Sequence, residues 1–136
     1  YYYYVGSTSQ LEKIIKQKRK GKFNIVLIVG IMLYLNDNDV IEMLQQIERC
    51  CEKEAVICIR EPIGIEERLT LKDYYSDELK CDYNAIYRTR DEIKEILKDT
   101  LLNKNFAIET ERFLFEADEL NNRKETKQYY YILKRK

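Results

Sequence analysis

The amino-acid sequence predicts an α/β fold whose sheet is mostly parallel and ends in an antiparallel hairpin. Three observations carry this prediction. The runs 23–30 and 55–59 are hydrophobic at consecutive positions, which is typical of strands buried on both faces. Amphipathic segments precede and separate these runs, as consecutive βα units require. Near the C-terminus, 106–115 and 128–133 have the composition of two further strands joined by a polar connector.

Length and composition limit the classes of protein that this chain can belong to. Its 136 residues are the size of one domain, 1–136, and 24 basic residues balance 24 acidic ones. A net charge of zero gives no global argument for nucleic acid or an anionic membrane as partner. The chain has no histidine, which excludes Ser-His-Asp triads, Cys-His pairs and every metal site that contains histidine. The longest apolar stretch, 23–35, is too short to span a bilayer.

The cysteines indicate a reducing compartment. Cys50, Cys51, Cys58 and Cys81 contain no CxxC pair, and the neighbours Cys50 and Cys51 are poorly placed to bond to each other. We therefore expect free thiols in a cytoplasmic protein, with neither a disulfide framework nor a zinc site.

The first elements are predicted from turn and capping residues. Residues 1–5 are aromatic and β-branched and end at Gly6, which predicts a strand that stops at a turn. Ser9 and Glu12 have the spacing of a helix capping box, and Gly21 would close that helix after a basic last turn.

The middle of the chain continues with strands and a helix. After the strand at 23–30, the segment 35–39 is rich in N-cap residues and predicts a helix of about four turns. The strand at 55–59 follows and is expected to end at Arg60-Glu61-Pro62. Residues 63–88 show no periodicity, so we expect a lid or a binding loop there.

The last elements are a helix and a hairpin. Thr89 and Glu92 form a second capping box, and the helix that it begins would end near Asn103. The two C-terminal strands then pair across the polar connector 118–126.

In this order the elements resemble the C-terminal part of class I S-adenosylmethionine-dependent methyltransferases. The segment 23–37 is similar to the family's fourth strand and the residues after it, and 55–62 resembles strand five. The segment 83–89 is similar to the residues before the last helix, and 128–133 to the final strand. The resemblance implies a three-layer, Rossmann-like sheet and S-adenosylmethionine as cofactor.

Two motifs of that family are absent from the sequence. They are the Gly-rich loop after strand one and the acidic residue at the end of strand two. The resemblance therefore begins at strand three, here 1–5, and the fold would be incomplete in its N-terminal half. In the family's strand order, 3-2-1-4-5-7-6, strands three and four lie roughly 14 Å apart. The edge of strand four would then be uncovered.

Three arrangements would cover this edge. The missing half lies upstream in a longer polypeptide, which we favour, or a partner chain supplies it. Alternatively, residues 1–5 pair directly with the strand at 23–30, which makes a rearranged sheet.

The resemblance also implies cofactor contacts at the carboxyl edge of the sheet. The candidates are Ser7, Gly30, Ile31 and Met32. For each of them a structural role is the alternative, such as a strand-to-loop turn at Gly30.

Candidate acceptor residues follow the strand at 55–59. Glu61 is the candidate catalytic group, because methyl transfer needs an oriented or deprotonated acceptor atom. Arg60 and Arg88 are candidates to hold a carboxylate or phosphate of the acceptor. Tyr83 and Tyr87 are candidate walls of the acceptor pocket, with ordinary packing under the loop as the alternative.

These residues predict methyl transfer to oxygen or nitrogen of a small polar acceptor or of a protein N-terminus. The alternative is a non-catalytic, methyltransferase-like subunit that completes or regulates a partner, and a homodimer also remains open. A third reading, nucleic-acid binding through the basic clusters 16–22 and 134–136, is disfavoured because a solvated helix end and a solvated terminus explain them.

Overall fold

The computed structural model describes residues 3–18, 21–77, 80–115 and 123–136. Its elements, with η for a 3₁₀ helix, are η1 (Thr8–Gln10), α1 (Leu11–Lys18), β1 (Phe23–Val29), η2 (Met32–Tyr34), α2 (Asp37–Arg49), β2 (Cys51–Gly64), β3 (Leu69–Ser76), β4 (Cys81–Tyr87), α3 (Arg90–Thr100), η3 (Leu102–Lys104), β5 (Phe106–Phe113) and β6 (Thr126–Arg135). None of the helices in these ranges is long and apolar enough to cross a membrane.

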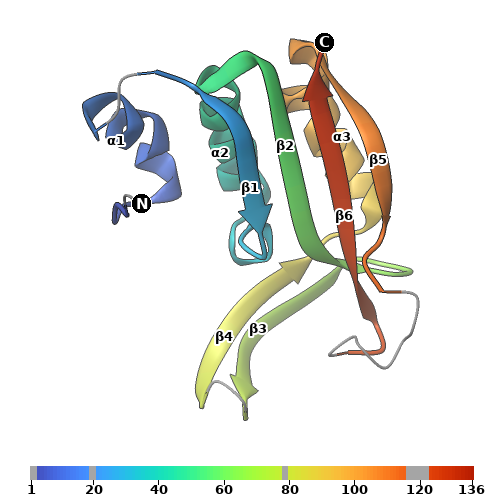
Figure 1. Ribbon diagram of the computed structural model, residues 1–136. Coiled ribbons are helices and arrows are strands. Elements are labelled where there is room, and N and C mark those ends of the chain that lie inside the picture. The colour runs from blue at the N-terminus through green and yellow to red at the C-terminus, as the bar shows by residue number, and fades with distance from the viewer. Residues whose placement is uncertain (1–2, 19–20, 78–79, 116–122) are drawn as a thin grey trace.

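The main sheet has four strands in the order β1-β2-β6-β5 (Figure 1). β1 is parallel to β2, whereas β6 is antiparallel to both of its neighbours, β2 and β5. The predicted α/β fold with a C-terminal antiparallel hairpin is confirmed. Among the described strands of this sheet, its parallel part is the single pair β1 and β2.

The helices α2 and α3 cover one face of this sheet and lie behind it in Figure 1. Ile28, Ile59 and Tyr131 lie side by side on β1, β2 and β6 and face the helices. Val40 and Leu44 of α2, Leu97 of α3 and Leu101 directly after α3 belong to the same core and are fully buried. This face of the sheet therefore contains the hydrophobic core.

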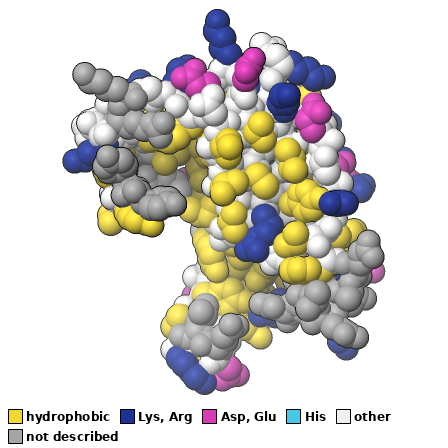
Figure 2. All heavy atoms as spheres, viewed as in Figure 1, with side chains coloured by type: hydrophobic (Ala, Val, Ile, Leu, Met, Phe, Trp, Pro, Cys, Tyr) yellow, Lys and Arg dark blue, Asp and Glu magenta, His cyan; other side chains and the backbone are white. Residues whose placement is uncertain are grey.

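The opposite face of β1 is uncovered in the described part of the chain. Ile25, Leu27 and Val29 are 68%, 69% and 50% exposed. Figure 2 shows hydrophobic side chains gathered over this face of the sheet. The prediction that the strand at 23–30 is buried on both faces is therefore wrong for the described residues, because only one face of the sheet has helices packed on it.

The N-terminal prediction is also wrong where the structure describes it. Residues 3–5 form no strand, and Tyr3, Tyr4 and Val5 are exposed. They pair with no described strand, so the arrangement in which 1–5 covers β1 is not formed by them. Tyr1 and Tyr2 lie outside the described residues.

The N-termini of the helices confirm two of the three predicted caps. Asn36 caps α2 by accepting a hydrogen bond from the backbone N–H of Asp39. The predicted capping box of Thr89 and Glu92 is formed at the start of α3. The box predicted at Ser9 is not formed, because Ser7 accepts the cap bond instead and Glu12 pairs with Lys16 and Arg49.

β2 extends through Arg60-Glu61-Pro62 to Gly64, although these three residues were expected to end it. Beyond Arg60, β2 has no β1 neighbour; it pairs with β6 on one side and has a single bridge, from Gly64 to Thr89, on the other. On that other side, the N–H of Gly64 donates to the carbonyl oxygen of Arg88. Residues two apart on a strand direct their N–H groups to the same side, so the position where Pro62 lacks an N–H also faces away from β6. Proline is tolerated at such an edge position.

The segment 63–88 contains a β-hairpin where a loop was expected. β3 and β4 pair antiparallel, with a register shift between Leu71 and Tyr74, where Asp73 has a φ of 49°. This irregularity interrupts the alternation of apolar and polar residues, and alternation is the signal by which a strand is recognised. In Figure 1 the hairpin projects from the carboxyl end of β1 and β2.

Candidate functional site

A pocket of about 210 Å³ lies at the carboxyl ends of β1 and β2, where open α/β sheets bind ligands. Polar and aromatic side chains form most of its wall. The lining residues are Gly30, Leu33, Tyr34, Arg60, Pro62, Tyr87, Arg123, Thr126 and Gln128. Three of the predicted site residues, Gly30, Arg60 and Tyr87, are therefore brought together here.

Gly30 makes the turn that follows β1. Its φ is 61°, a left-handed conformation that other residues adopt only with strain. Its N–H donates to the carbonyl oxygen of Arg60, with an N–O distance of 2.9 Å. The chain consequently leaves the sheet at Gly30, and residues 31–35 form one side of the site.

Glu61 holds the beginning of this loop. Its Oε1 accepts hydrogen bonds from the backbone N–H of Ile31 at 2.8 Å and of Met32 at 3.0 Å. The side chain is 2% exposed, and Oε2 is buried with no hydrogen-bond partner among the described residues. Burial raises the pKa of Glu61, and the backbone N–H groups of 31–33 only partly oppose that shift. The carboxyl therefore contacts backbone and does not line the pocket.

Arg88 holds the same loop from the opposite side. Its Nη1 donates to the carbonyl oxygen of Met32 at 2.8 Å and its Nη2 to that of Leu35 at 2.7 Å. Its Nε lies 2.7 Å from Oδ1 of Asp37 at the start of α2. The guanidinium is 2% exposed, so it serves the loop and not the pocket.

A second arginine extends this network to α3. Arg68 contacts both carboxylate oxygens of Asp37, at 3.0 and 3.2 Å, and Oε1 of Glu92 at 3.2 Å. Burial acts to raise the pKa of Asp37, but the hydrogen bonds and charges of Arg68 and Arg88 outweigh it and lower the pKa. Asp37 therefore stays ionised and joins the N-termini of α2 and α3.

Tyrosines of the β3–β4 hairpin support the far wall of the pocket. Arg123 donates from Nη2 to the hydroxyl of Tyr83 at 3.0 Å and lies 4.5 Å from the ring centroid of Tyr74. Burial, together with a hydrogen bond that the Tyr87 hydroxyl shares with Tyr83, raises the pKa of Tyr87 to about 12. Tyr87 is consequently a neutral phenol at physiological pH and is not a base.

We predict that the two substitutions at Glu61 have opposite effects at pH 8. Glu61→Gln keeps an acceptor for Ile31 and Met32 and removes a buried charge, so its free energy of unfolding should equal or exceed that of the wild type. Glu61→Ala leaves two N–H groups unpaired and should lose about 2–4 kcal/mol. Urea unfolding of both variants measures this difference.

The raised pKa of Glu61 also sets the pH dependence. Its contribution to stability is fully present below the unfolded pKa of about 4.3 and is lost as pH rises through the folded pKa. The advantage of Glu61→Gln over the wild type should therefore appear only above this window. Equal losses for Gln and Ala at pH 8 would contradict the assignment.

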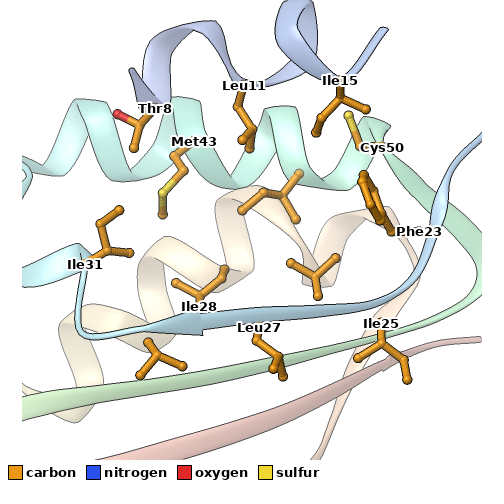
Figure 3. Close-up of a pocket in the computed structure, with 13 residues that line it drawn as sticks. Thr8, Leu11, Ile15, Phe23, Ile25, Leu27, Ile28, Ile31, Met43 and Cys50 are labelled. Atoms are coloured by element: carbon orange, nitrogen blue, oxygen red, sulfur yellow. The ribbon is translucent and has the colours of Figure 1, made fainter. Parts of the chain in front are cut away.

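An apolar groove of about 540 Å³ runs along the open edge of β1, between this strand and α1 (Figure 3). Aliphatic, aromatic and sulfur-bearing side chains line it, with Thr8 as its one hydroxyl. The lining residues are Thr8, Leu11, Ile15, Phe23, Ile25, Val26, Leu27, Ile28, Val29, Ile31, Met43, Ile47 and Cys50. Figure 3 shows Ile25 and Leu27 on the side of β1 away from the helices.

The predicted cofactor residues are divided between these two sites. Gly30 lines the pocket, whereas the side chain of Ile31 lines the groove. Met32 is buried in the core and is 1% exposed. Ser7 caps η1 and lines neither site, although its neighbour Thr8 lines the groove.

Sequence reasoning missed the other six lining residues of the pocket, and Tyr34 and Arg123 are the most informative of them. Tyr34 carries a usable signal, since it is an aromatic residue in the short segment between the apolar strand and the N-cap residues of the next helix. Arg123 lies in a polar connector and has no such signal; only the contact with Tyr83 reveals its place.

No protein-family model matches the chain, and no curated protein matches its sequence. Solved structures do match. One is an S-adenosylmethionine-dependent methyltransferase from Methanosarcina mazei, with a TM-score of 0.63 and 11% identity over 97% of this chain and 66% of that one. Another is the 1,6-didemethyltoxoflavin-N1-methyltransferase of Burkholderia thailandensis, with a TM-score of 0.60 and 11% identity over 87% of this chain and 47% of that one.

The chain has a methyltransferase fold. A third structure of this fold is described as a pericyclic reaction enzyme, with a TM-score of 0.53 and 10% identity over 85% of this chain and 27% of that one. The methyltransferase fold thus supports more than one reaction. The chain spans between about a quarter and two-thirds of the length of these three structures.

The described residues do not fit S-adenosylmethionine by themselves. The cofactor carries ribose hydroxyls, an ammonium and a carboxylate, and each needs a polar partner when buried. The groove beside β1 offers the hydroxyl of Thr8 and the thiol of Cys50, and none of the described residues that line the groove or the pocket is acidic. The part of the methyltransferase fold described here therefore supplies an incomplete cofactor site.

Proposed function

We propose that the chain is the acceptor-binding half of an S-adenosylmethionine-dependent methyltransferase. Its acceptor would be a small polar molecule or a protein N-terminus, methylated on oxygen or nitrogen. The observation that carries the proposal is the apolar edge of β1, which pairs with no other described strand, in a methyltransferase fold. The pocket at the carboxyl ends of β1 and β2 is then the acceptor site.

A further β–α unit would hold the cofactor, either upstream in the same polypeptide or in a partner chain. The N–H of Gly30 points to β2, so those of Leu27 and Val29 point to the open edge, because backbone groups alternate along a strand. Backbone groups at an open edge favour pairing with another strand. The apolar groove provides the side-chain contacts for such a unit.

The site residues take different roles in this proposal. Arg60 and Tyr87 contact the acceptor, and Tyr83 acts through Arg123. We assign Glu61 and Arg88 as positioning residues, because both are buried against the backbone of 31–35.

The cofactor-side roles follow from the same geometry. Gly30 and Ile31 would lie next to the cofactor from the carboxyl end of β1. Ser7 and Met32, which line neither site, would support it indirectly. The cytoplasm remains our proposed compartment, on the spacing of the four cysteines.

Calorimetry with S-adenosylhomocysteine tests the proposal. Two samples are compared. One is the purified 136-residue chain, and the other is the assembly recovered from the native cells, which contains this chain with any polypeptide joined or bound to it. We expect micromolar binding for the recovered assembly and none for the purified chain. Micromolar binding by the purified chain would overturn the division of the site, and no binding by either would overturn methyl transfer.

The second candidate function is a non-catalytic subunit that completes or regulates a partner. The uncovered face of β1, with Ile25, Leu27 and Val29 exposed, favours it. This candidate predicts that a partner binds at the open edge of β1 and that the resulting assembly does not bind S-adenosylhomocysteine. The same calorimetry therefore separates the two candidates.

A further inference from the structure

Among the described residues, those that line the pocket at the carboxyl ends of β1 and β2 carry two positive charges and no negative one. Arg60 and Arg123 line it, and none of its lining residues is Asp or Glu. Its volume of about 210 Å³ is below the roughly 300–1,000 Å³ of pockets for drug-sized ligands. The occupant is therefore small.

Arg60 has no acidic partner among the described residues. On β2 it lies between Val29 of β1 and Tyr130 of β6, which are both uncharged. Its Nε is buried and has no hydrogen-bond partner in the described part of the chain. A guanidinium N–H that is shielded from water without a partner costs free energy until an acceptor binds.

Arg123 is directed into the pocket by uncharged groups. It contacts the hydroxyl of Tyr83 and the ring of Tyr74, and neither neutralises its charge. The other arginines near the fold's centre differ, since Arg68 and Arg88 each contact the carboxylate of Asp37. Arg60 and Arg123, which have no carboxylate partner among the described residues, thus share a pocket.

The remaining walls indicate what accompanies the anion. Tyr34, Pro62 and Tyr87 offer flat apolar surfaces, and Tyr87 keeps its proton at physiological pH. Such surfaces favour a planar or aromatic body, whereas guanidinium groups favour bidentate oxyanions.

We propose that this pocket binds a small planar ligand through its carboxylate or phosphate group, with Arg60 and Arg123 as the anion ligands. The inference rests on the proposed function in one respect, that this ligand is the methyl acceptor. The anion site itself depends only on the pocket. Binding and methyl transfer can therefore fail separately.

Titration of the ¹⁵N-labelled full chain with benzoate, phenyl phosphate and neutral benzamide tests the anion site. At constant ionic strength, we expect benzoate or phenyl phosphate to shift the amide signals of Gly30 and Arg60, and to bind about tenfold or more tightly than benzamide. The stronger of the two anions identifies carboxylate or phosphate as the preferred group.

Variants locate the site. Arg60→Met and Arg123→Met should each weaken anion binding about tenfold or more and leave benzamide binding unchanged. Arg60→Lys should weaken it less, because it keeps the charge but loses the planar fork. The control is Arg49→Met, an exposed arginine of α2 that pairs with Glu12 outside the pocket, and it should have no effect.

Two results would overturn the inference: equal binding of benzoate, phenyl phosphate and benzamide, or anion binding that both Arg60→Met and Arg123→Met leave intact. An assembly that binds S-adenosylhomocysteine while the pocket ignores anions would refute the anion site alone. Anion binding without S-adenosylhomocysteine binding by the assembly would keep the site and refute the methyl acceptor.

Discussion

Replacing Arg88 with methionine is expected to lower the free energy of unfolding by about 3–5 kcal/mol, the largest loss from any single polar side chain of the site. The substitution leaves the carbonyl oxygens of Met32 and Leu35 without their donor. It also removes the ion pair with Asp37, although that carboxylate is half exposed and regains water. Most of the loss therefore comes from the two carbonyl groups.

Urea unfolding measures this loss, with Arg90→Met as the matched control. Arg90 is nearby in sequence and exposed, and its ion pair with Asp91 spans 3.6 Å, so its removal should change stability by less than about 0.5 kcal/mol. Arg88→Lys should fall between the two, because one ammonium cannot replace three directed donors. A loss below about 1 kcal/mol for Arg88→Met would show that the loop at 31–35 is held by other contacts.

Lysine at Ile28 and lysine at Leu27 should have very different effects. Ile28 is 4% exposed in the core, so Ile28→Lys buries an unpaired charge and should cost more than about 4 kcal/mol. Leu27 is 69% exposed on the uncovered face, so Leu27→Lys should change the free energy of unfolding by less than about 0.5 kcal/mol.

The lysine variant at Leu27 also tests the proposal that a further β–α unit binds along the open edge of β1. In the assembly recovered from cells, Leu27→Lys should abolish S-adenosylhomocysteine binding, because it places a charge in the apolar groove beside β1. Urea unfolding of the purified chain and calorimetry of the assembly give the two readings. A large loss of stability for Leu27→Lys in the purified chain would mean that its side chain is covered after all.

Local signals in the sequence were sufficient for the elements whose ends depend on one or two side chains. Asn36 and Thr89 each accept the N–H three residues later, so α2 and α3 begin where capping rules place them. At α1 the same rules failed, because Arg49 of α2 attracts Glu12 away from its own helix start. Residues distant in sequence decided that end.

Among the site residues, too, some positions could be predicted from local sequence and others depended on tertiary contacts. Gly30 and Arg60 were predicted from their position after apolar strands, and they do share a pocket. Glu61 and Arg88 follow the same kind of signal, yet their side chains turn inward to the loop at 31–35. Side-chain direction on β2 alternates between the two faces, so neighbours such as Arg60 and Glu61 have opposite surroundings.

The sequence by itself determined the α/β class, the residues at which α2 and α3 begin and the residues that end β1, because these depend on local periodicity and capping. Only the tertiary structure decided which face of β1 is covered, that 63–88 contains a hairpin, and that Arg123 joins Arg60. Burial and charge pairing depend on which segments meet in space, and a linear pattern of hydrophobic residues does not specify those neighbours.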